Sequence, residues 1–462
     1  MIDLIRGKEV LVVGLARSGV AAARLLAELG ARQVTVNDRK PAEALAKELE
    51  TLRKFSAVKA VTGANPPDLI HPALSLVIKS PGVPPYLEIF QRAAQMQIPV
   101  LSEIELAYAF IKAPLVGITG TNGKTTTTAL TAEILKKAGF RQVMAAGNIG
   151  VPLCEAVGQI DSAGVIVAEL SSFQLEDIRL FRPAVAVFLN FAEDHMDYHG
   201  SMERYFKAKA RILENQTASD LAVLNAEDEA VSTLGEQTAG TVLWFAKKAV
   251  SRGAGLDKDM VTLFAPGGEP EPLCHKSEVA LPGEHNLENA LAAAAAAWAA
   301  GADPPAIAET LRTFRGIEHR LERVGHIRDV AFVNDSKGTN PGATIRALRS
   351  FPGKRKILIA GGEDKGADFS ELALVIKEEV AHLVLLGETK EKIAAAVRQA
   401  GFTGYTMAAD LQEAVAQAWR AAVPGDLILL SPACASWDMY SDYEARGNHF
   451  KSLVRALEQG EI

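Results

Sequence analysis

Short apolar runs that end in Gly, Asn, Asp or Ser recur along the whole chain, and helical segments lie between them. This alternation is typical of parallel α/β sheets, in which each strand is buried on both faces and is followed by a helix. We therefore predict an α/β fold whose strands lie mostly parallel.

The predicted strands fall into three groups along the 462-residue chain. A chain of this length has room for roughly two to four domains, because domains usually contain about 100–200 residues. We predict three doubly wound domains: a Rossmann-like N-terminal domain, a P-loop-type ATP-binding central domain and a Rossmann-like C-terminal domain. The predicted domains are residues 1–101, 102–316 and 317–462, and the predicted strands are residues 9–14, 33–38, 76–80, 115–119, 142–146, 164–169, 185–190, 221–225, 330–335, 356–361, 382–387 and 426–431.

Composition excludes several classes of protein. The net charge of −7 and the pI of about 5.8 argue against a general binder of nucleic acids or membrane surfaces. Cys154, Cys274 and Cys434 form no CxxC pair, which indicates a reducing compartment without a disulfide or zinc framework. The first residues do not resemble a signal peptide, and no apolar run reaches the roughly 20 residues of a membrane helix. We expect a cytoplasmic protein.

Residues 117–126 form a glycine-rich loop with the sequence Gly-Ile-Thr-Gly-Thr-Asn-Gly-Lys-Thr-Thr, between an apolar run and a helix-like segment. Glycines let backbone N–H groups converge on an anion, Lys124 adds a charge for terminal phosphates, and a Thr hydroxyl can bind Mg²⁺. The spacing differs from the common P-loop, because the first glycine is displaced. The loop predicts ATP binding; the alternative is a surface turn with an unrelated lysine.

A second glycine-containing turn follows the first predicted strand, with Gly14 and Gly19 before a helix of small residues. This is the beginning of a Rossmann-like unit, and Asp38 ends the next strand, where an acid often holds a ribose hydroxyl. The full GxGxxG fingerprint is absent, which favours another nucleotide diphosphate over NAD. A tight turn without a ligand is the alternative. Residues 80–85 form a rigid Pro-rich turn after a further strand.

Acids and imidazoles follow two strands of the middle group. Glu169 ends an apolar strand, at the sheet edge where α/β proteins bind ligands, and could hold Mg²⁺ or cap a helix. Residues 190–199 contain His195 and His199 among several acids. His195 could ligate a metal or be a hydrogen-bonded loop histidine, whereas nothing supports a role for His199 beyond structure.

Two helices of the middle group carry further polar candidates. The amphipathic helix 203–214 contains Lys207 and Lys209, and a lysine on such a helix usually faces solvent. Another helix begins near Asn286, and Asn289 lies one turn after His285 on the same face. These Asn side chains could bind a purine or ribose, or Asn286 could be an N-cap.

The third group places cations and hydroxyls in post-strand loops at residues 334–340, 361–366 and 431–438, with Arg320 before them. Cys434 lies in the last of these loops. A catalytic role for this cysteine is disfavoured, because no Cys–His pair is evident.

Taken together and in order, these motifs resemble the Mur ligase family of peptidoglycan synthesis, over essentially the whole chain. The residues that carry the resemblance are 117–126, 169–174, Asp194, His195, Met196, Asp197, Gly283, His285, Asn286, Asn289, His319, Arg320, 334–337, Thr339, Asn340, Gly361, Gly362, Lys365 and 431–436.

The resemblance implies three α/β domains that bind, in order, a UDP-linked substrate, ATP with Mg²⁺, and an amino acid. Gly14, Leu15, Ala16, Asp38, Arg39, Gly82, Asn148 and His195 would bind the UDP substrate. Gly120, Thr121, Asn122, Gly123, Lys124, Thr125, Thr126, Asn289, Arg320 and Asp335 would bind ATP. Thr125, Glu169, His195 and Lys209 would hold Mg²⁺, and Lys337, Thr339, Lys365, Ser436 and Tyr443 would bind D-glutamate.

The family also implies a catalytic set of Lys124, His195 and a carbamylated lysine that supports a second Mg²⁺. The matching position is Lys209, with Lys207 as the neighbouring alternative. The implied reaction is ATP-driven addition of D-glutamate to UDP-N-acetylmuramoyl-L-alanine through an acyl phosphate, and domain closure would expel water. Only small-molecule partners are expected, with no nucleic acid, no membrane insertion and a monomeric state.

Three rival functions stay open at this point. The loop at residues 335–340 disfavours a sister ligase for another amino acid, and the loop at residues 14–19 disfavours a folylpolyglutamate synthetase. A nucleotide-binding regulator or ATPase module without ligase activity would hydrolyse ATP independently of any amino acid.

Overall fold

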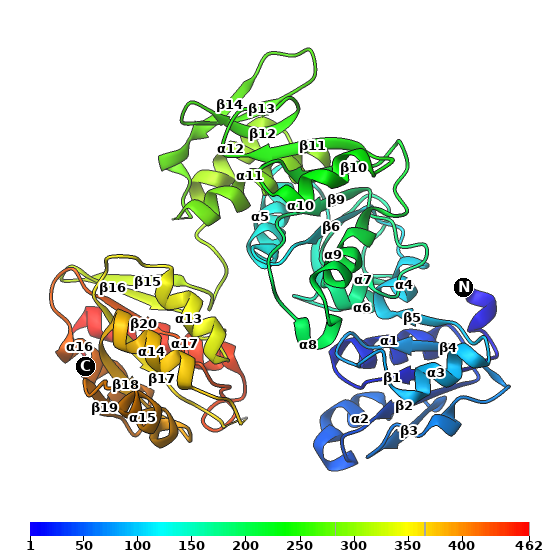
Figure 1. Cartoon of the computed structure of the whole chain (residues 1–462), viewed down its shortest axis with the longest axis horizontal. Helices are drawn as coiled ribbons and strands as arrows, with labels where there is room; N and C mark the ends of the chain where they lie inside the picture. The colour runs from blue at the N-terminus through cyan, green and yellow to red at the C-terminus, as the bar shows by residue number, and fades with distance from the viewer. Residues whose placement is uncertain (282, 365, 462) are drawn as a thin grey trace. The chain divides into compact units, whose positions relative to one another are not determined.

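The structure is a computed structural model and describes residues 1–281, 283–364 and 366–461. The chain divides into two compact units, Met1–Phe314 and Arg315–Ile462 (Figure 1). The first unit contains a five-stranded and a nine-stranded sheet, and the second contains a six-stranded sheet. Helices connect the strands in all three parts, which confirms the predicted α/β class.

The first sheet is fully parallel and has the strand order β3-β2-β1-β4-β5. The order reverses at β1, so the loops after β1 and β4 lie at a topological switch point, where open α/β sheets bind ligands. Its strands are β1 (Glu9–Val13), β2 (Gln33–Asp38), β3 (Val58–Thr62), β4 (Leu74–Lys79) and β5 (Val100–Ser102), and its helices are α1 (Arg17–Glu28), α2 (Ala46–Leu52) and α3 (Glu88–Gln95).

The second sheet has the order β14-β13-β12-β11-β10-β9-β6-β8-β7. It is parallel from β7 to β12, and β12, β13 and β14 add an antiparallel edge. The strands are β6 (Leu115–Thr119), β7 (Val143–Gly147), β8 (Val165–Glu169), β9 (Val185–Phe188), β10 (Leu221–Asn225), β11 (Thr241–Ala246), β12 (Gly253–Asp257), β13 (Met260–Phe264) and β14 (Glu271–His275).

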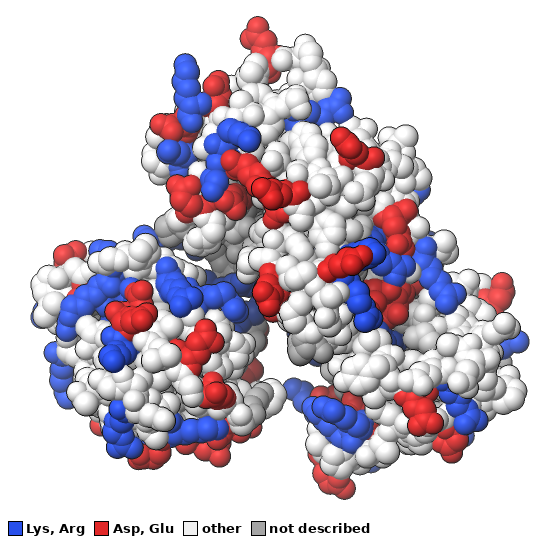
Figure 2. Space-filling model, viewed as in Figure 1, with Lys and Arg blue, Asp and Glu red and all other residues white. Residues whose placement is uncertain are grey.

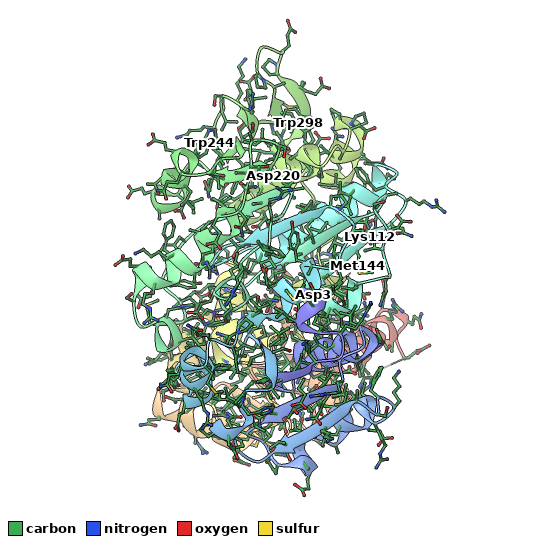
Figure 3. All side chains as sticks on the ribbon, turned by 90° about the vertical axis from the view of Figure 1, so that its right-hand side faces the viewer. Asp3, Lys112, Met144, Asp220, Trp244 and Trp298 are labelled. Carbon is green, nitrogen blue, oxygen red and sulfur yellow. The ribbon has the colours of Figure 1, made fainter. Side chains whose placement is uncertain are left out.

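Both faces of this sheet are buried. Val165 and Val167 of β8 join one hydrophobic cluster and Ile166 joins the other, as the alternation of side chains along a strand requires. Trp244 of β11 packs against the cluster that contains Ile166, and Trp298 packs against the cluster that contains the two valines; both tryptophans are labelled in Figure 3. The apolar run of β8 therefore reflects burial on two sides.

Helices α5 (Lys124–Lys137) and α11 (Glu284–Ala299) pack side by side against this sheet (Figure 1). The alanine run of α11 is fully buried, as its composition predicts. The other helices of this part are α4 (Glu103–Tyr108), α6 (Leu153–Ala156), α7 (Ser172–Leu175), α8 (Met196–His199), α9 (Met202–Ala210), α10 (Glu229–Ser232) and α12 (Pro304–Thr313).

The third sheet has the order β15-β16-β20-β17-β18-β19 and is parallel except for the β15–β16 pair. Because β20 lies between β16 and β17, the loops after these three strands meet at one edge. The elements are β15 (Glu322–Ile327), β16 (Val330–Asn334), α13 (Pro341–Arg349), β17 (Lys356–Ala360), α14 (Ser370–Glu379), β18 (Val380–Leu385), α15 (Lys390–Gln399), β19 (Tyr405–Met407), α16 (Leu411–Ala421), β20 (Leu427–Leu430) and α17 (Tyr443–Gln459).

Every predicted strand is present, within two residues at each end. The predicted boundary at residue 101 falls within β5, and the one at residue 316 falls two residues after Phe314, the last residue of the first unit. The division into three domains at these positions stays a prediction. Acidic and basic side chains are interspersed on the face in Figure 2. In the described part of the chain, no helix combines the length and apolar character needed to cross a membrane.

Candidate active site

The glycine-rich loop connects β6 to α5, and two of its glycines are required by its geometry. Gly120 has a φ of +150° and Gly123, the N-cap of α5, has a φ of +81°. A Cβ at Gly120 would lie 2.9 Å from the Leu189 Cβ, and one at Gly123 would collide with the Asn289 Oδ1. Asn289, from the first turns of α11, therefore packs directly against the loop.

Hydrogen bonds to backbone groups fix the loop in place. The Thr121 N–H donates to the Asn190 carbonyl over 3.0 Å, and the Asn122 N–H donates to the Asn190 Oδ1 over 2.8 Å. The Lys124 Nζ donates to the carbonyls of Gly120 at 2.9 Å and Thr121 at 2.8 Å. The loop ends at the N-terminus of the 14-residue helix α5. The N-terminus of a helix favours an anion such as a phosphate.

Lys209 reaches the same loop from α9. Its side chain is 1% exposed, and its Nζ donates to the Gly120 carbonyl over 2.7 Å and lies 4.7 Å from the centre of the Tyr205 ring. Burial, together with the nearby charge of Lys124, lowers the pKa of Lys209 to about 6. A substantial fraction of its amine is therefore neutral at neutral pH.

Lys207, the neighbouring alternative, lies elsewhere on α9. Its side chain is exposed and pairs with Glu203 one turn earlier, at 2.7 Å. The structure therefore places Lys209, and not Lys207, at the glycine-rich loop.

Glu169 ends β8, beside β6, and the residue is 2% exposed. Its Oε1 accepts a hydrogen bond from the Asn148 Nδ2 at 2.7 Å, while its buried Oε2 has no hydrogen-bond partner among the described residues. Leaving a buried carboxylate oxygen without a partner costs free energy, which a bound cation would offset. Carboxylate and hydroxyl oxygens are ligands suited to Mg²⁺, so the chemistry of Glu169 and of Thr125, the second residue of α5, fits the predicted metal.

His195 and His199 have opposite environments. His195 is the N-cap of α8, has a φ of +53°, and exposes its ring, with its Nε2 3.6 Å from the Asp194 Oδ2. His199 is buried, and its Nε2 lies 2.9 Å from the Ser172 Oγ. Burial lowers the pKa of His199, so this ring is a neutral structural group and His195 is the accessible imidazole.

The predicted nucleotide loop after β1 is held by Asp38 and Ser80. The Asp38 Oδ2 accepts the Leu15 N–H at 2.8 Å, and the Ser80 Oγ donates to the Gly14 carbonyl at 2.7 Å. Gly14 has a φ of +92°, and a Cβ there would lie 2.5 Å from Val83. Of the other residues predicted for this site, Ala16 is the N-cap of α1, and Arg39 and Gly82 are exposed.

The second unit carries Asp335 and Arg320, predicted to bind ATP. Asp335 is buried, its Oδ2 accepts from the Ser431 Oγ at 2.7 Å, and its Oδ1 accepts from the Leu321 N–H at 3.3 Å. Burial raises the pKa of Asp335 to about 6. Arg320 is exposed, two residues before β15.

Of the residues predicted to bind D-glutamate, Lys337, Thr339 and Ser436 lie in loops at the same edge of the third sheet, and Tyr443 begins α17. The Lys337 Nζ lies 5.7 Å from the centre of the Tyr443 ring, and Ser436 is buried in the loop after β20. Thr339 follows Lys337 by two residues in the loop after β16. Lys365 lies outside the described residues. Burial raises the pKa of the Cys434 thiol to about 11, in agreement with a structural cysteine.

Arg446 supports the loops predicted to bind D-glutamate, which the sequence did not reveal. The residue is 3% exposed, and its guanidinium donates to the carbonyls of Ser336, Cys434 and Ala435 over 2.9–3.2 Å, and to the Ser336 Oγ over 3.0 Å. It thereby ties the loop after β16 to the loop after β20. An arginine in a helix usually faces solvent, and only the fold places this one beneath the two loops.

Comparison with known proteins assigns the family. The N-terminal domain of MurD-like Mur ligases matches residues 8–102, the Mur ligase middle domain matches residues 118–297, and the glutamate ligase domain of Mur ligases matches residues 319–434. The chain is also 45% identical to a UDP-N-acetylmuramoylalanine--D-glutamate ligase of Pelotomaculum thermopropionicum, over 98% of both chains. The chain belongs to the Mur ligase family.

Further proteins are similar to this chain in sequence or in fold. A UDP-N-acetylmuramoylalanine--D-glutamate ligase of Clostridioides difficile is 42% identical over 98% of this chain and its own full length. Among solved structures, the UDP-N-acetylmuramate-alanine ligase of Thermotoga maritima has a TM-score of 0.56 at 22% identity, over 97% of this chain and 99% of its own. FolC of E. coli, solved with ADP, has a TM-score of 0.52 over 77% of this Mur ligase and 94% of its own chain, at 18% identity. Both likenesses concern the fold.

Proposed function

We propose that this Mur ligase adds D-glutamate to UDP-N-acetylmuramoyl-L-alanine at the expense of ATP. The observation that carries the proposal is the match, over nearly the whole chain, to proteins named for this reaction. The glycine-rich loop, with Lys124 and the N-terminus of α5, supports the use of ATP.

In the proposed first step, the alanyl carboxylate attacks the γ-phosphorus of ATP, the bond to ADP breaks, and an acyl phosphate forms. Lys124 and Arg320 would offset the charge on the transferring phosphoryl group, and Asn289 and Asp335 would bind the nucleotide. Thr125, Glu169, His195 and Lys209 would hold Mg²⁺, which when bound stabilises negative charge on phosphoryl oxygens.

In the proposed second step, the amine of D-glutamate attacks the acyl carbon, the amide bond forms and phosphate leaves. The attacking amine must lose a proton, for which the accessible His195 or a phosphate oxygen is the candidate base. Lys337, Thr339, Lys365, Ser436 and Tyr443 would hold D-glutamate. The loops after β1 and β4, with Asn148, would hold the UDP substrate.

Lys209 would act as a carbamate, as the family resemblance implies. A neutral amine adds to CO₂ and releases a proton, which turns a basic side chain into an anionic oxygen ligand. The lowered pKa of Lys209 and its position at Gly120 support this role. We further propose that the protein is a cytoplasmic monomer that acts on these small molecules alone.

An oxygen-isotope experiment tests the proposal. The enzyme is given ATP, D-glutamate and UDP-N-acetylmuramoyl-L-alanine with both alanyl carboxylate oxygens labelled with ¹⁸O. We expect one label in the released phosphate and one in the new amide, as an acyl phosphate requires. Phosphate without the label, formed with no amide product, would instead identify an ATPase module.

A further inference from the structure

A buried lysine at the end of β4 has no part in the proposed chemistry. The Lys79 side chain is 2% exposed, and lysine is rarely buried without a charged partner. Its Nζ lies 2.6 Å from the Asp177 Oδ2 and 3.6 Å from the Glu176 Oε2, two carboxylates that follow α7. This ion pair links the first sheet to the part of the chain built around the second.

The same ammonium group contacts α8. The Lys79 Nζ donates to the Tyr198 hydroxyl over 3.2 Å, and the hydroxyl in turn donates to the Glu176 Oε2 over 2.9 Å. Burial, and then the charge of Glu176, raises the pKa of Tyr198, so the phenol keeps its proton and remains a donor. Lys79, Tyr198 and Glu176 therefore form a closed chain of polar contacts.

Tyr198 is coupled to His195 through Phe173 of α7. The Phe173 ring centre lies 4.5 Å from that of Tyr198 and 4.9 Å from that of His195, and it stacks on His199 at 5.5 Å with an interplanar angle of 5°. Two side chains of the four-residue helix α8 and that of its N-cap, His195, thus pack on one ring. A shift of Tyr198 would move His195 with it, because α8 is a single turn.

Lys79 also adjoins the loop proposed to bind the UDP substrate. The next residue, Ser80, donates from its hydroxyl to the Gly14 carbonyl over 2.7 Å and from its N–H to the Val13 carbonyl over 2.9 Å. One strand end therefore contacts both the substrate loop and, through Lys79, the helix that carries His195.

We propose that Lys79 is a positioning residue that holds α8, through Tyr198, so that His195 faces the reacting end of the UDP-linked substrate. This inference deepens the proposed function and rests on it for the role of His195. Lys79 touches no reacting atom, so its loss changes the orientation of α8 and leaves the contacts of the uridine nucleotide in place.

The variants Lys79→Met and Tyr198→Phe test the proposal. The first removes the ammonium group, and the second removes only the hydroxyl that joins α8 to it while keeping the ring on Phe173. The control is Lys276→Met, which breaks an exposed lysine–aspartate pair of similar length, 2.8 Å to Asp259. We expect kcat to fall about tenfold in both test variants with KM for the UDP substrate within about twofold, and the double variant to lose no more than Lys79→Met.

Hydrogen–deuterium exchange of residues 194–200 gives a readout that does not depend on activity. Faster exchange in Lys79→Met and Tyr198→Phe, but not in Lys276→Met, would support the positioning role. Unchanged exchange and kcat in both variants would overturn it, and Tyr198→Phe alone decides if Lys79→Met does not fold. Faster exchange in a protein whose wild type forms no amide would support the link to α8 and refute the proposed function.

Discussion

The carbonyl of Gly120 accepts hydrogen bonds from two lysines, Lys124 of its own loop and Lys209 of α9. Both amino groups share this acceptor, and burial, followed by the charge of Lys124, lowers the pKa of Lys209. Conversion of Lys209 to a carbamate would turn this repulsion into attraction. Because the lowered pKa leaves much of its amine neutral, Lys209 of α9 can be buried beside Lys124.

Lys124→Ala should lower kcat by at least about 100-fold, because the charge proposed to stabilise the transferring phosphoryl group is lost. Affinity for UDP-N-acetylmuramoyl-L-alanine should stay near the wild-type value. Steady-state kinetics and calorimetric titration measure the two quantities. Lys136→Ala, at the exposed end of the same helix, is the control, and an unchanged kcat in Lys124→Ala would refute the role of this lysine.

Lys209→Ala should also lose about 100-fold in kcat, and bicarbonate should not restore it. The wild type, by contrast, should lose activity when CO₂ is removed and regain it when bicarbonate is added. Lys207→Ala is a matched control from the same helix and should keep normal activity. The opposite pattern, with Lys207→Ala inactive and Lys209→Ala active, would show that the wrong lysine is assigned.

Sequence reasoning predicted the residues of the site unevenly, for physical reasons. Gly123 and Lys124 could be predicted from the residues alone, because a phosphate loop needs such residues at fixed spacing. Lys209 needed the family resemblance, because a lysine in an amphipathic helix carries no sign of burial. Arg446 was missed for the same reason. It joins two loops that are far apart in the sequence and that only the fold brings together.

At the scale of elements, α4 follows the first sheet and begins with two buried acids. The Glu105 carboxylate accepts the N–H groups of Arg179, Leu180 and Phe181, each at 2.9 Å. Glu103 accepts only the Cys154 N–H, at 2.6 Å, and its second oxygen has no hydrogen-bond partner among the described residues. The two acids therefore differ in how well the fold stabilises their charge.

Burial raises the pKa of Glu103 from 4.5 to about 7. Between these values the folded protein binds more protons than the unfolded chain, so the free energy of unfolding falls as pH rises. Glu103→Gln lacks this titration. From about pH 5 to about pH 8, the stability of the variant should therefore rise relative to the wild type by about 2 kcal/mol.

Urea unfolding at the two pH values measures this difference. Replacement of Trp419 and Trp437 by Phe in both proteins leaves Trp244 and Trp298 as the fluorescent reporters, and these lie in the same unit as Glu103. An equal stability difference at both pH values would mean that Glu103 is ionised in the folded protein at about pH 5.

Some elements were predicted more accurately than others. The limits of β2, β6 and β10 match the predicted strands, since β6 and β10 are mainly apolar runs that end in Thr or Asn, and β2 has alternating valines and ends in Asp. The antiparallel strands β12 and β14 were missed, because sequences such as Gly-Ala-Gly-Leu-Asp and Glu-Pro-Leu-Cys-His lack such a run. The pairing of β14 depends on a neighbouring strand, which local sequence does not specify.

At the scale of the whole molecule, the proposed work is divided between the two units. The glycine-rich loop, Glu169 and Lys209 lie in Met1–Phe314, whereas all residues proposed to bind D-glutamate lie in Arg315–Ile462. The order of the motifs along the chain predicted this division. If the division is correct, ATP turnover should depend on the amino acid that the second unit accepts.

The most direct test of the account is phosphate release from ATP in the presence of UDP-N-acetylmuramoyl-L-alanine, with one amino acid added at a time. We predict rapid release with D-glutamate alone, and a stoichiometric amide product. Release with a different amino acid would contradict the assignment of the loops in the second unit. Release at the same rate with every amino acid, or with none, would contradict the ligase itself.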